Sequence, residues 1–332
     1  MNMLLTQPKF RERVRSCRSQ VRQSWQQLGL ALVILILFIF FSVNAPNFLS
    51  SGNLLDVLRQ ISFVGVIACG MTLVIVAAEI DLSVGSMVGL SSALIGILAS
   101  QHSWPVWLAA LAALVAGLIS GALAGAIRFL FKVPSFIVTL GLYSALRGLA
   151  LFSTNAFPNT ISSSRFQTLG AGTVAGIPTP IYFLAAVAAL CWFVMSRTTF
   201  GRSLYAVGGN PEAARLSGIS IARVQIAIFC VTGVLAALAG VLLSARLASG
   251  NPNLGNGYEF DAISAVIIGG TSLFGGRGSI FGTLLGLLFV GILTNGLVLL
   301  NISSYAQDII RGVVVVVAVI VGQIGTRASN TA

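Results

Sequence analysis

The chain has 332 residues, of which 56% are hydrophobic and only 8% charged, and its mean hydropathy is +0.96. Soluble domains carry roughly 25% charged residues, so this composition excludes a soluble globular protein and predicts an all-α polytopic membrane protein. The apolar runs are continuous over about twenty residues, which excludes a transmembrane barrel. The net charge of +11 does not indicate nucleic-acid binding, because Lys and Arg cluster beside the apolar runs, where they set membrane orientation.

The first 27 residues are strongly basic, with six Lys and Arg against the single acid Glu12. By the positive-inside rule, we expect residues 1–27 to form a cytoplasmic segment. A cleaved signal peptide is the alternative, but the apolar run over 28–43 is long for one and no small-x-small cleavage site follows it. The expected transmembrane domain then covers 28–325, and residues 326–332 form a short cytoplasmic tail.

Ten apolar segments are interpreted as membrane spans, which places both termini in the cytoplasm. Most of the 19 Lys and Arg fall on the inner side under this assignment. The polar segment 154–180 is then the largest outer loop, and 249–258 is an outer turn. The predicted spans are 28–45, 54–78, 84–101, 105–127, 134–153, 181–196, 224–248, 259–273, 280–299 and 305–324.

The segment 199–223 is a long polar interruption between two long apolar runs. It predicts a loop followed by a helix of about two turns, because Asn210 suits an N-cap, Pro211 the first helical position and Glu212 the positive end of the helix dipole. Gly218 suits the exit from that helix. We expect this helix to lie outside the lipid, where another protein can bind it.

Glycines recur every four residues within one predicted span, at Gly117, Gly121 and Gly125. This small-xxx-small pattern predicts close packing of helix backbones, for which lipid provides no hydrophobic driving force. The alternative is a bundle whose helices slide during function. The same spacing occurs at Gly85 with Gly89, and at Gly282 with Gly286.

Several ionisable side chains fall inside or at the ends of spans, where burial is costly, so they are functional candidates. We take five residues as candidates for a translocation path. The structural alternatives stay open: Asp81 is then a helix N-cap residue, and Glu259 and Asp261 belong to the first turn of a helix at the membrane surface. Asp308 and Arg311 lie three residues apart and predict an ion pair on one helix face. The path candidates are Glu79, Asp81, Ser83, Glu259 and Asp261.

No catalytic or metal-binding constellation is visible. The lone His102 excludes most nucleophilic triads, and the four cysteines have no CxxC spacing, so neither a zinc site nor a disulfide framework is predicted. No Gly-Lys dipeptide occurs, which excludes a GxxxxGK[ST] phosphate loop. Transport would then be driven either by a partner ATPase docked on 199–223, or by protons or sodium coupled through the membrane acids.

Five motifs in order resemble the membrane subunit of bacterial ABC sugar importers, of the ribose, xylose, arabinose and galactoside permease family. The resemblance covers about residues 28–325. One departure is Glu79, where many relatives have Gly. The motifs are GMTLVIVAAEIDLSVGSMVGL (70–90), VPSFIVTLGLYSALRG (133–148), TFGRSLYAVGGNPEAARLSGI (199–219), ARLASGNPNLGNGYEFDAISAVIIGGTSLFGGRGSIFGTLLG (245–286) and NGLVLLNISSYAQDIIRG (295–312).

This resemblance implies a permease in the bacterial inner membrane with a second permease copy, identical or a close paralogue. It also implies two copies of an ABC ATPase inside and a periplasmic sugar-binding protein outside. ATP would bind to the partner, so this chain needs no cofactor. An ion-coupled sugar transporter and a non-transporting scaffold are the alternatives, and the solute stays open. The implied ATPase-coupling residues are Gly201, Arg202, Gly208, Gly209, Asn210, Glu212, Ala213, Ala214, Arg215 and Gly218.

Overall fold

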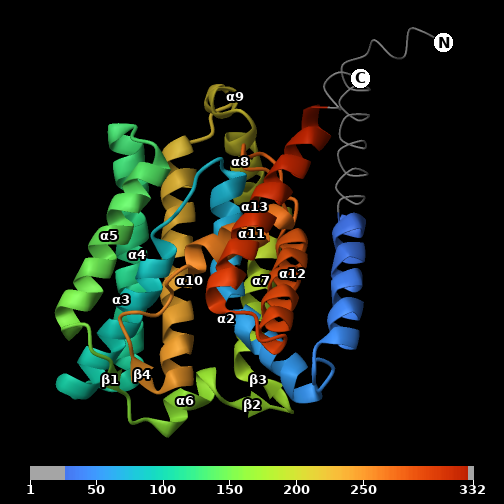
Figure 1. Ribbon diagram of the computed structural model, residues 1–332. Coiled ribbons are helices and arrows are strands. Elements are labelled where there is room, and N and C mark those ends of the chain that lie inside the picture. Colours follow the sequence, from blue (N-terminus) through green and yellow to red (C-terminus); the bar gives the residue numbers. More distant parts are fainter. Residues whose placement is uncertain (1–26, 328–332) are drawn as a thin grey trace.

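The computed structural model describes residues 27–327, which are almost entirely helical (Figure 1). The predicted basic segment 1–27 and the tail 326–332 lie almost wholly outside the described residues. The helices are a first helix Gln27–Asn44, α2 (Ser51–Val76), α3 (Val84–Gly96) continued by the π-helical η2 (Ile97–Gln101), α4 (Val106–Phe131), α5 (Ser135–Thr154), α6 (Ser164–Gly170), α7 (Thr179–Arg197), α8 (Thr199–Gly209), α9 (Pro211–Leu216), α10 (Ile221–Leu247), α11 (Tyr258–Ile268), α12 (Ile280–Leu299) and α13 (Ser304–Arg327).

Four two-residue strands form two small antiparallel pairs. β1 (Asn159–Thr160) pairs with β4 (Ser249–Gly250), and β2 (Thr173–Val174) pairs with β3 (Ile177–Pro178). Both pairs lie with α6 at one end of the molecule, which we call the strand end (Figure 1). Helix α9 lies at the opposite end, the α9 end. The predicted loop 154–180 is therefore not plain loop but carries α6 and three of the four strands.

Eight helices of the described chain are long and apolar enough to cross a membrane, which supports the predicted class. The predicted span 259–273 is wrong as a complete span, because α11 has 11 residues and is about 17 Å long, against about 30 Å of hydrocarbon. Helix α11 and the irregular segment 251–257 before it together return the chain from the strand end towards the α9 end (Figure 1).

Helices α4 and α10 pack against each other at backbone contact through glycine. A Cβ at Gly117 would overlap the carbonyl oxygen of Gly233, and one at Gly121 would overlap that of Phe229. At Gly125 a Cβ would lie 2.7 Å from the Cα of Ile226. The predicted close packing through this glycine series is therefore confirmed.

The centre of the bundle is formed by α2, α3 and α10. The second half of α2 is buried almost without interruption, and nearly all of α3 is buried too. Helix α10 packs against both of them as well as α4. The peripheral helices α5 and α7 bury only a few residues each, so most of their apolar side chains are exposed. The irregular segments described below are attached to this buried centre.

Candidate functional site

The polar segment 199–223 forms two helices at the α9 end rather than the predicted loop and one helix. Residues 199–209 form α8, whose N-cap Thr198 accepts a hydrogen bond from the Gly201 amide at 3.1 Å. Gly201, Leu204, Val207 and Gly208 are buried, so one stripe of α8 packs on the bundle. Spacings of three and four residues between buried positions are typical of a helix packed on one face, and they could have predicted α8. Glycines occupy positions at both ends of this pattern, so it did not look apolar in the sequence.

The short helix α9 has the predicted capping. Asn210 Oδ1 accepts a hydrogen bond from the Ala213 amide at 3.0 Å, and Pro211 is the first helical residue. Gly218 follows the helix with φ +81°, a backbone conformation that favours glycine. Ala214 is buried, whereas Leu216 is 76% exposed. Helix α9 therefore presents an apolar side chain to the surroundings with nothing in the described chain covering it.

Glu212 and Arg215 form an exposed ion pair on α9, with Arg215 Nη2 donating to Glu212 Oε1 at 2.5 Å. The Arg215 hydrogen bonds and charge lower the pKa of Glu212 below its ordinary value of 4.5. A carboxyl whose pKa is lowered on folding contributes stability above its unfolded pKa, and that contribution is lost as the pH falls through the folded value. The pair is therefore intact throughout the neutral range.

A junction of glycine backbones joins α8 to the membrane helices. A Cβ at Gly208 would overlap the carbonyl oxygen of Val76, the last residue of α2. That same oxygen accepts a hydrogen bond from the Gly276 amide at 2.8 Å, in the segment between α11 and α12. Tyr205 of α8 donates its hydroxyl to the Gly278 carbonyl at 2.8 Å. Helix α8 is thus in direct contact with the end of α2 and with the segment after α11.

The first irregular segment inside the bundle is 77–83, between α2 and α3. Its backbone needs polar partners, because unpaired amides are costly at membrane depth. Ser135 Oγ and Thr139 Oγ1 of α5 accept hydrogen bonds from the Ile80 and Leu82 amides, each at 3.1 Å. The break is therefore held by α5.

Glu79 and Asp81 in this segment are both buried, and each has its own partners. Glu79 accepts from Arg128 Nε at 3.1 Å and from Gln225 Nε2 at 2.6 Å, which ties the break to α4 and α10. Asp81 Oδ1 accepts from the Ser83 amide at 2.9 Å and from the Ser83 hydroxyl at 2.6 Å. The N-cap of α3 is Ser83, so the interpretation of Asp81 as the N-cap is wrong by two residues.

The second irregular segment, 251–257, enters the bundle, so the predicted outer turn 249–258 is wrong beyond β4. It packs against α3 so closely that a Cβ at Gly89 would lie 2.5 Å from the Pro252 carbonyl oxygen. Arg147 of α5 donates to the carbonyls of Pro252 and Leu254, at 2.6 and 3.1 Å, and to that of Gly85 at 3.3 Å. Arg147 therefore satisfies carbonyls of the broken segment, and no local sequence pattern predicted this pairing.

Glu259 and Asp261 lie in the first turn of α11, as the structural alternative expected. Glu259 is 2% exposed, and its Oε2 has no hydrogen-bond partner among the described residues. A Cβ at Gly85 would overlap this oxygen, so the starts of α3 and α11 touch. Asp261 pairs with Arg311 of α13 at 3.5 Å, and Asp308 pairs with the same guanidinium at 3.6 Å. The predicted Asp308–Arg311 pair is confirmed. The additional ion pair of Arg311 with Asp261 of α11 was not predicted.

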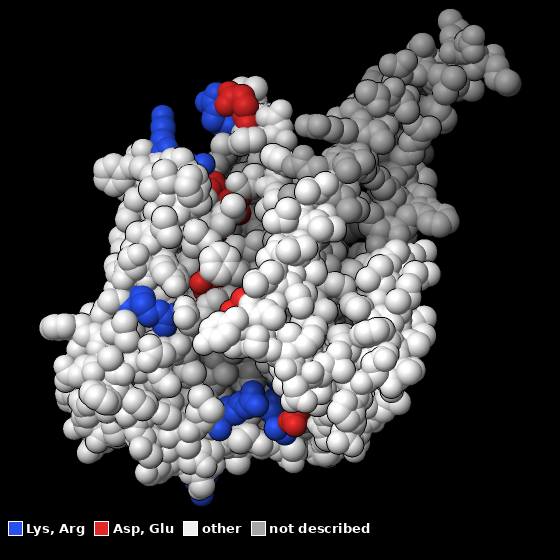
Figure 2. Space-filling view, in the orientation of Figure 1, with Lys and Arg blue, Asp and Glu red and all other residues white. Residues whose placement is uncertain are grey.

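Figure 2 shows charged side chains on one face of the molecule, spread from the α9 end towards the strand end. Some of the red atoms are recessed between white surfaces, and we call this part the charged hollow. The five candidates for the translocation path thus lie at the two broken segments. The structure adds three further candidates that bind the broken segments, namely Arg128, Arg147 and Gln225.

Comparison with known proteins identifies the family. Residues 53–319 match the family model described as "Branched-chain amino acid transport system / permease component". The chain belongs to this family of ABC-transporter permeases. It is 47% identical to the "Probable ABC transporter permease protein YphD" of Escherichia coli K12, over 96% of this chain and 95% of the relative.

Sugar permeases are also among the relatives of this permease. It is 44% identical to the "Ribose import permease protein RbsC" of Bacillus subtilis, over 89% of this chain and 92% of the relative. It is 35% identical to the "L-arabinose transport system permease protein AraH" of E. coli K12, over 92% of this chain and 93% of the relative. The family match supports an ABC permease over the ion-coupled alternative, and it spans α8, α9 and both broken segments.

Proposed function

We propose that the permease forms the membrane path of an ATP-driven importer for a sugar such as a pentose. The relatives named for ribose and arabinose support this cargo, because they match nearly their whole length at 35–44% identity. The family description names amino acids instead, but those words describe the family as a whole. The path residues also favour a neutral solute, because Glu79 and Asp261 are each paired with an arginine.

The observation that carries the mechanism is the junction of α8 with the end of α2, just before the first break, and with the segment that follows α11. Helix α9 projects from the molecule with Leu216 and the Glu212–Arg215 pair exposed. Through Gly208 and Tyr205, α8 contacts Val76, just before the first break, and the segment that follows α11. A partner that moves α9 would therefore move the residue before the first break together with the segment that follows α11. We assign α8 and α9 as the ATPase-coupling element.

The α9 end is assigned to the cytoplasm, which gives ten crossings with both termini inside. Arg128 and Arg197 lie in the last turns of α4 and α7, which end there. Arg202, Arg215 and Arg223 lie in and just after the coupling helices. Cations on short loops mark the cytoplasmic side. The crossings are the eight long helices, the pair of 251–257 with α11, and α13.

The partners follow from this orientation. An ABC ATPase binds ATP and docks on α9, so the permease itself carries no nucleotide. A periplasmic sugar-binding protein docks at the strand end. A second permease copy, identical or closely related, covers the charged hollow, since buried ionisable side chains in membranes face the protein interior or a water-filled path rather than lipid. In a bacterium this places the complex in the inner membrane.

Site-directed crosslinking tests the coupling element. Ala213 is exposed on α9, whereas Ala175 is a non-helical residue in the β2–β3 turn at the strand end. In membranes containing the permease and its ATPase, Ala213→Cys is expected to crosslink to the ATPase, and the control Ala175→Cys is not. Crosslinking from Ala175→Cys with none from Ala213→Cys would reject the orientation.

A further inference from the structure

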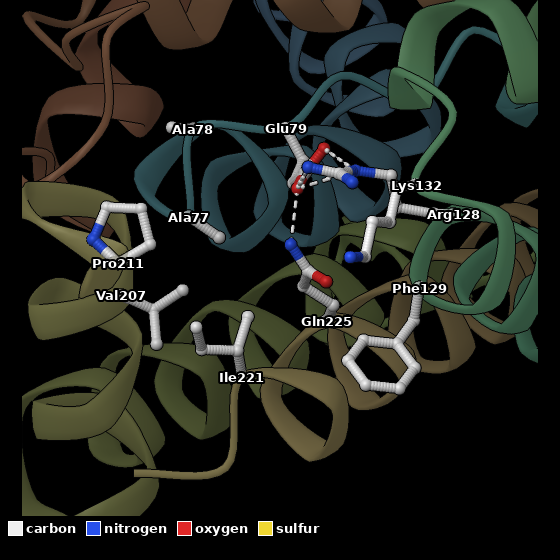
Figure 3. Close-up of a pocket in the computed structure, with 10 residues that line it drawn as sticks. All are labelled: Ala77, Ala78, Glu79, Arg128, Phe129, Lys132, Val207, Pro211, Ile221 and Gln225. Atoms are coloured by element: carbon white, nitrogen blue, oxygen red, sulfur yellow. Dashed lines mark hydrogen bonds and ion pairs between the residues drawn. The ribbon is translucent and has the colours of Figure 1, made fainter. Parts of the chain in front are cut away.

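A cavity of about 340 Å³ lies at the α9 end, between the first break and the start of α10 (Figure 3). This volume falls within the roughly 300–1,000 Å³ of typical small-molecule sites. Its walls come from five parts of the fold: the break 77–79, the end of α4, α8, the first residue of α9, and the start of α10. An occupant would therefore contact both coupling helices and the first break.

The polar groups of this cavity include both donors and acceptors. Glu79 is held by Arg128 and Gln225, which fixes the plane of its carboxylate. The Gln225 amide donates through Nε2, and its Oε1 accepts no hydrogen bond from the described residues. Lys132 has no ion pair within residues 27–327, and it reaches into the cavity from the same side as Arg128 (Figure 3). Free acceptors and free donors are thus side by side.

This mixture selects against an anion. A carboxylate or a fully ionised phosphate ester offers only acceptors, so it would satisfy Lys132 and leave Gln225 Oε1 unpaired beside the charge of Glu79. Hydroxyl groups donate and accept, and each hydroxyl of a sugar pairs with either kind of partner. Phe129 adds a flat apolar wall, and Val207 and Ile221 complete the apolar lining.

We propose that this cavity is a sugar subsite at the cytoplasmic exit of the path, the last contact of the cargo before release. The inference rests on the proposed sugar cargo and extends it to named residues. Glu79 and Gln225 accept from the sugar hydroxyls, Lys132 donates to them, and Phe129 packs on the apolar face of the ring. Pro211 lies in the wall, so movement of α9 changes the shape of the subsite and couples release to the ATPase cycle.

The test measures binding in the absence of the binding protein. The complete complex is first assayed for ATP-driven uptake of D-ribose and L-arabinose, and the imported sugar becomes the probe. Saturation-transfer NMR then measures binding of that probe, at millimolar concentration, to the permease–ATPase complex in nanodiscs. Saturable binding is expected, and it should weaken at least fivefold in Phe129→Leu and in Lys132→Asn.

Both variants are chosen to fold. Phe129 is 42% exposed, and Lys132 has φ +54°, which Asn tolerates. Gln101→Leu, at the far strand end, is the matched control and should bind like the wild type. Intact uptake with no saturable binding, or with binding that all three variants retain, would overturn the subsite alone. Binding of inorganic phosphate in place of the sugar would overturn its assigned chemistry. Failure to import either sugar would instead refute the proposed function.

Discussion

At the scale of single residues, two features stabilise the bundle of this permease: close contact between helix backbones, and hydrogen bonds to backbone carbonyls outside the helices. The glycines of α4 let its backbone touch that of α10, and Arg147 supplies donors to carbonyls that no helix satisfies. Both roles reflect one constraint, which is that backbone groups within lipid need either close packing or an internal polar partner. Substitutions at these positions are therefore expected to act on stability first and on transport through it.

Gly121→Ala should destabilise the permease by roughly 1–3 kcal/mol, because the new methyl group meets the Phe229 backbone rather than a side chain that could move. Gly29→Ala is the matched control, since a Cβ there meets nothing within 4 Å. Thermal unfolding of the two variants in the same detergent checks the difference. Equal midpoints would show that the glycine contact is not tight.

Arg147→Leu should cost roughly 2 kcal/mol, because three backbone carbonyls lose their charged donor. Arg147→Lys should recover only part of this loss, since an ammonium cannot reproduce the planar fork of a guanidinium. Hydrogen exchange of residues 251–257 gives the local readout, with the exposed Arg165→Leu as the control. If the hydrogen-exchange rates of residues 251–257 are unchanged in Arg147→Leu, Arg147 does not stabilise this segment.

At the scale of elements, the sequence predicted continuous helices well and broken ones poorly. Long apolar runs located α4, α5, α7 and α10 to within a few residues, because hydropathy depends only on the run itself. The 259–273 span failed because α11 is completed by an irregular segment whose carbonyls are satisfied by a residue about a hundred positions away. Such a long-range partner leaves no local pattern.

For α8 and α9 too, local features were predicted from the sequence and long-range contacts were not. The caps of α9 were predicted, since Asn210, Pro211 and Gly218 act within one turn. The contact of Gly208 with Val76 and Gly276 could not be predicted, because three distant segments create it. Glu79 was singled out as an acid in the membrane, yet its partners Arg128 and Gln225 were not, for the same reason.

Asn210→Ala tests the coupling element. Loss of the N-cap should weaken α9 by about 1 kcal/mol and lower the affinity for the ATPase roughly fivefold. Asn210→Ser retains a capping hydroxyl and should keep near-normal affinity. Affinity of the purified subunits, measured by biolayer interferometry, checks both variants. If Asn210→Ala binds the ATPase as tightly as the wild type, a preformed α9 is not needed for docking.

The whole molecule combines a buried centre of α2, α3 and α10 with two breaks, and the helices that follow the breaks touch at Gly85 and Glu259. One end carries the coupling helices, and the other carries the small strands (Figure 1). The permease has no GxxxxGK[ST] phosphate loop of its own, and we propose that energy reaches the first break from outside the chain, through α9. Glu79, Asp81 and Asp261 each have a structural partner, which favours an ATP-driven permease over an ion-coupled carrier.

Reconstitution is the most direct measurement of this claim. Proteoliposomes containing the permease are supplied with sugar under three conditions: with ATPase, binding protein and ATP; with the same proteins and no ATP; and with a proton or sodium gradient but no ATPase. The account predicts concentrative sugar uptake only under the first condition. Uptake driven by an ion gradient in vesicles that lack the ATPase would contradict it.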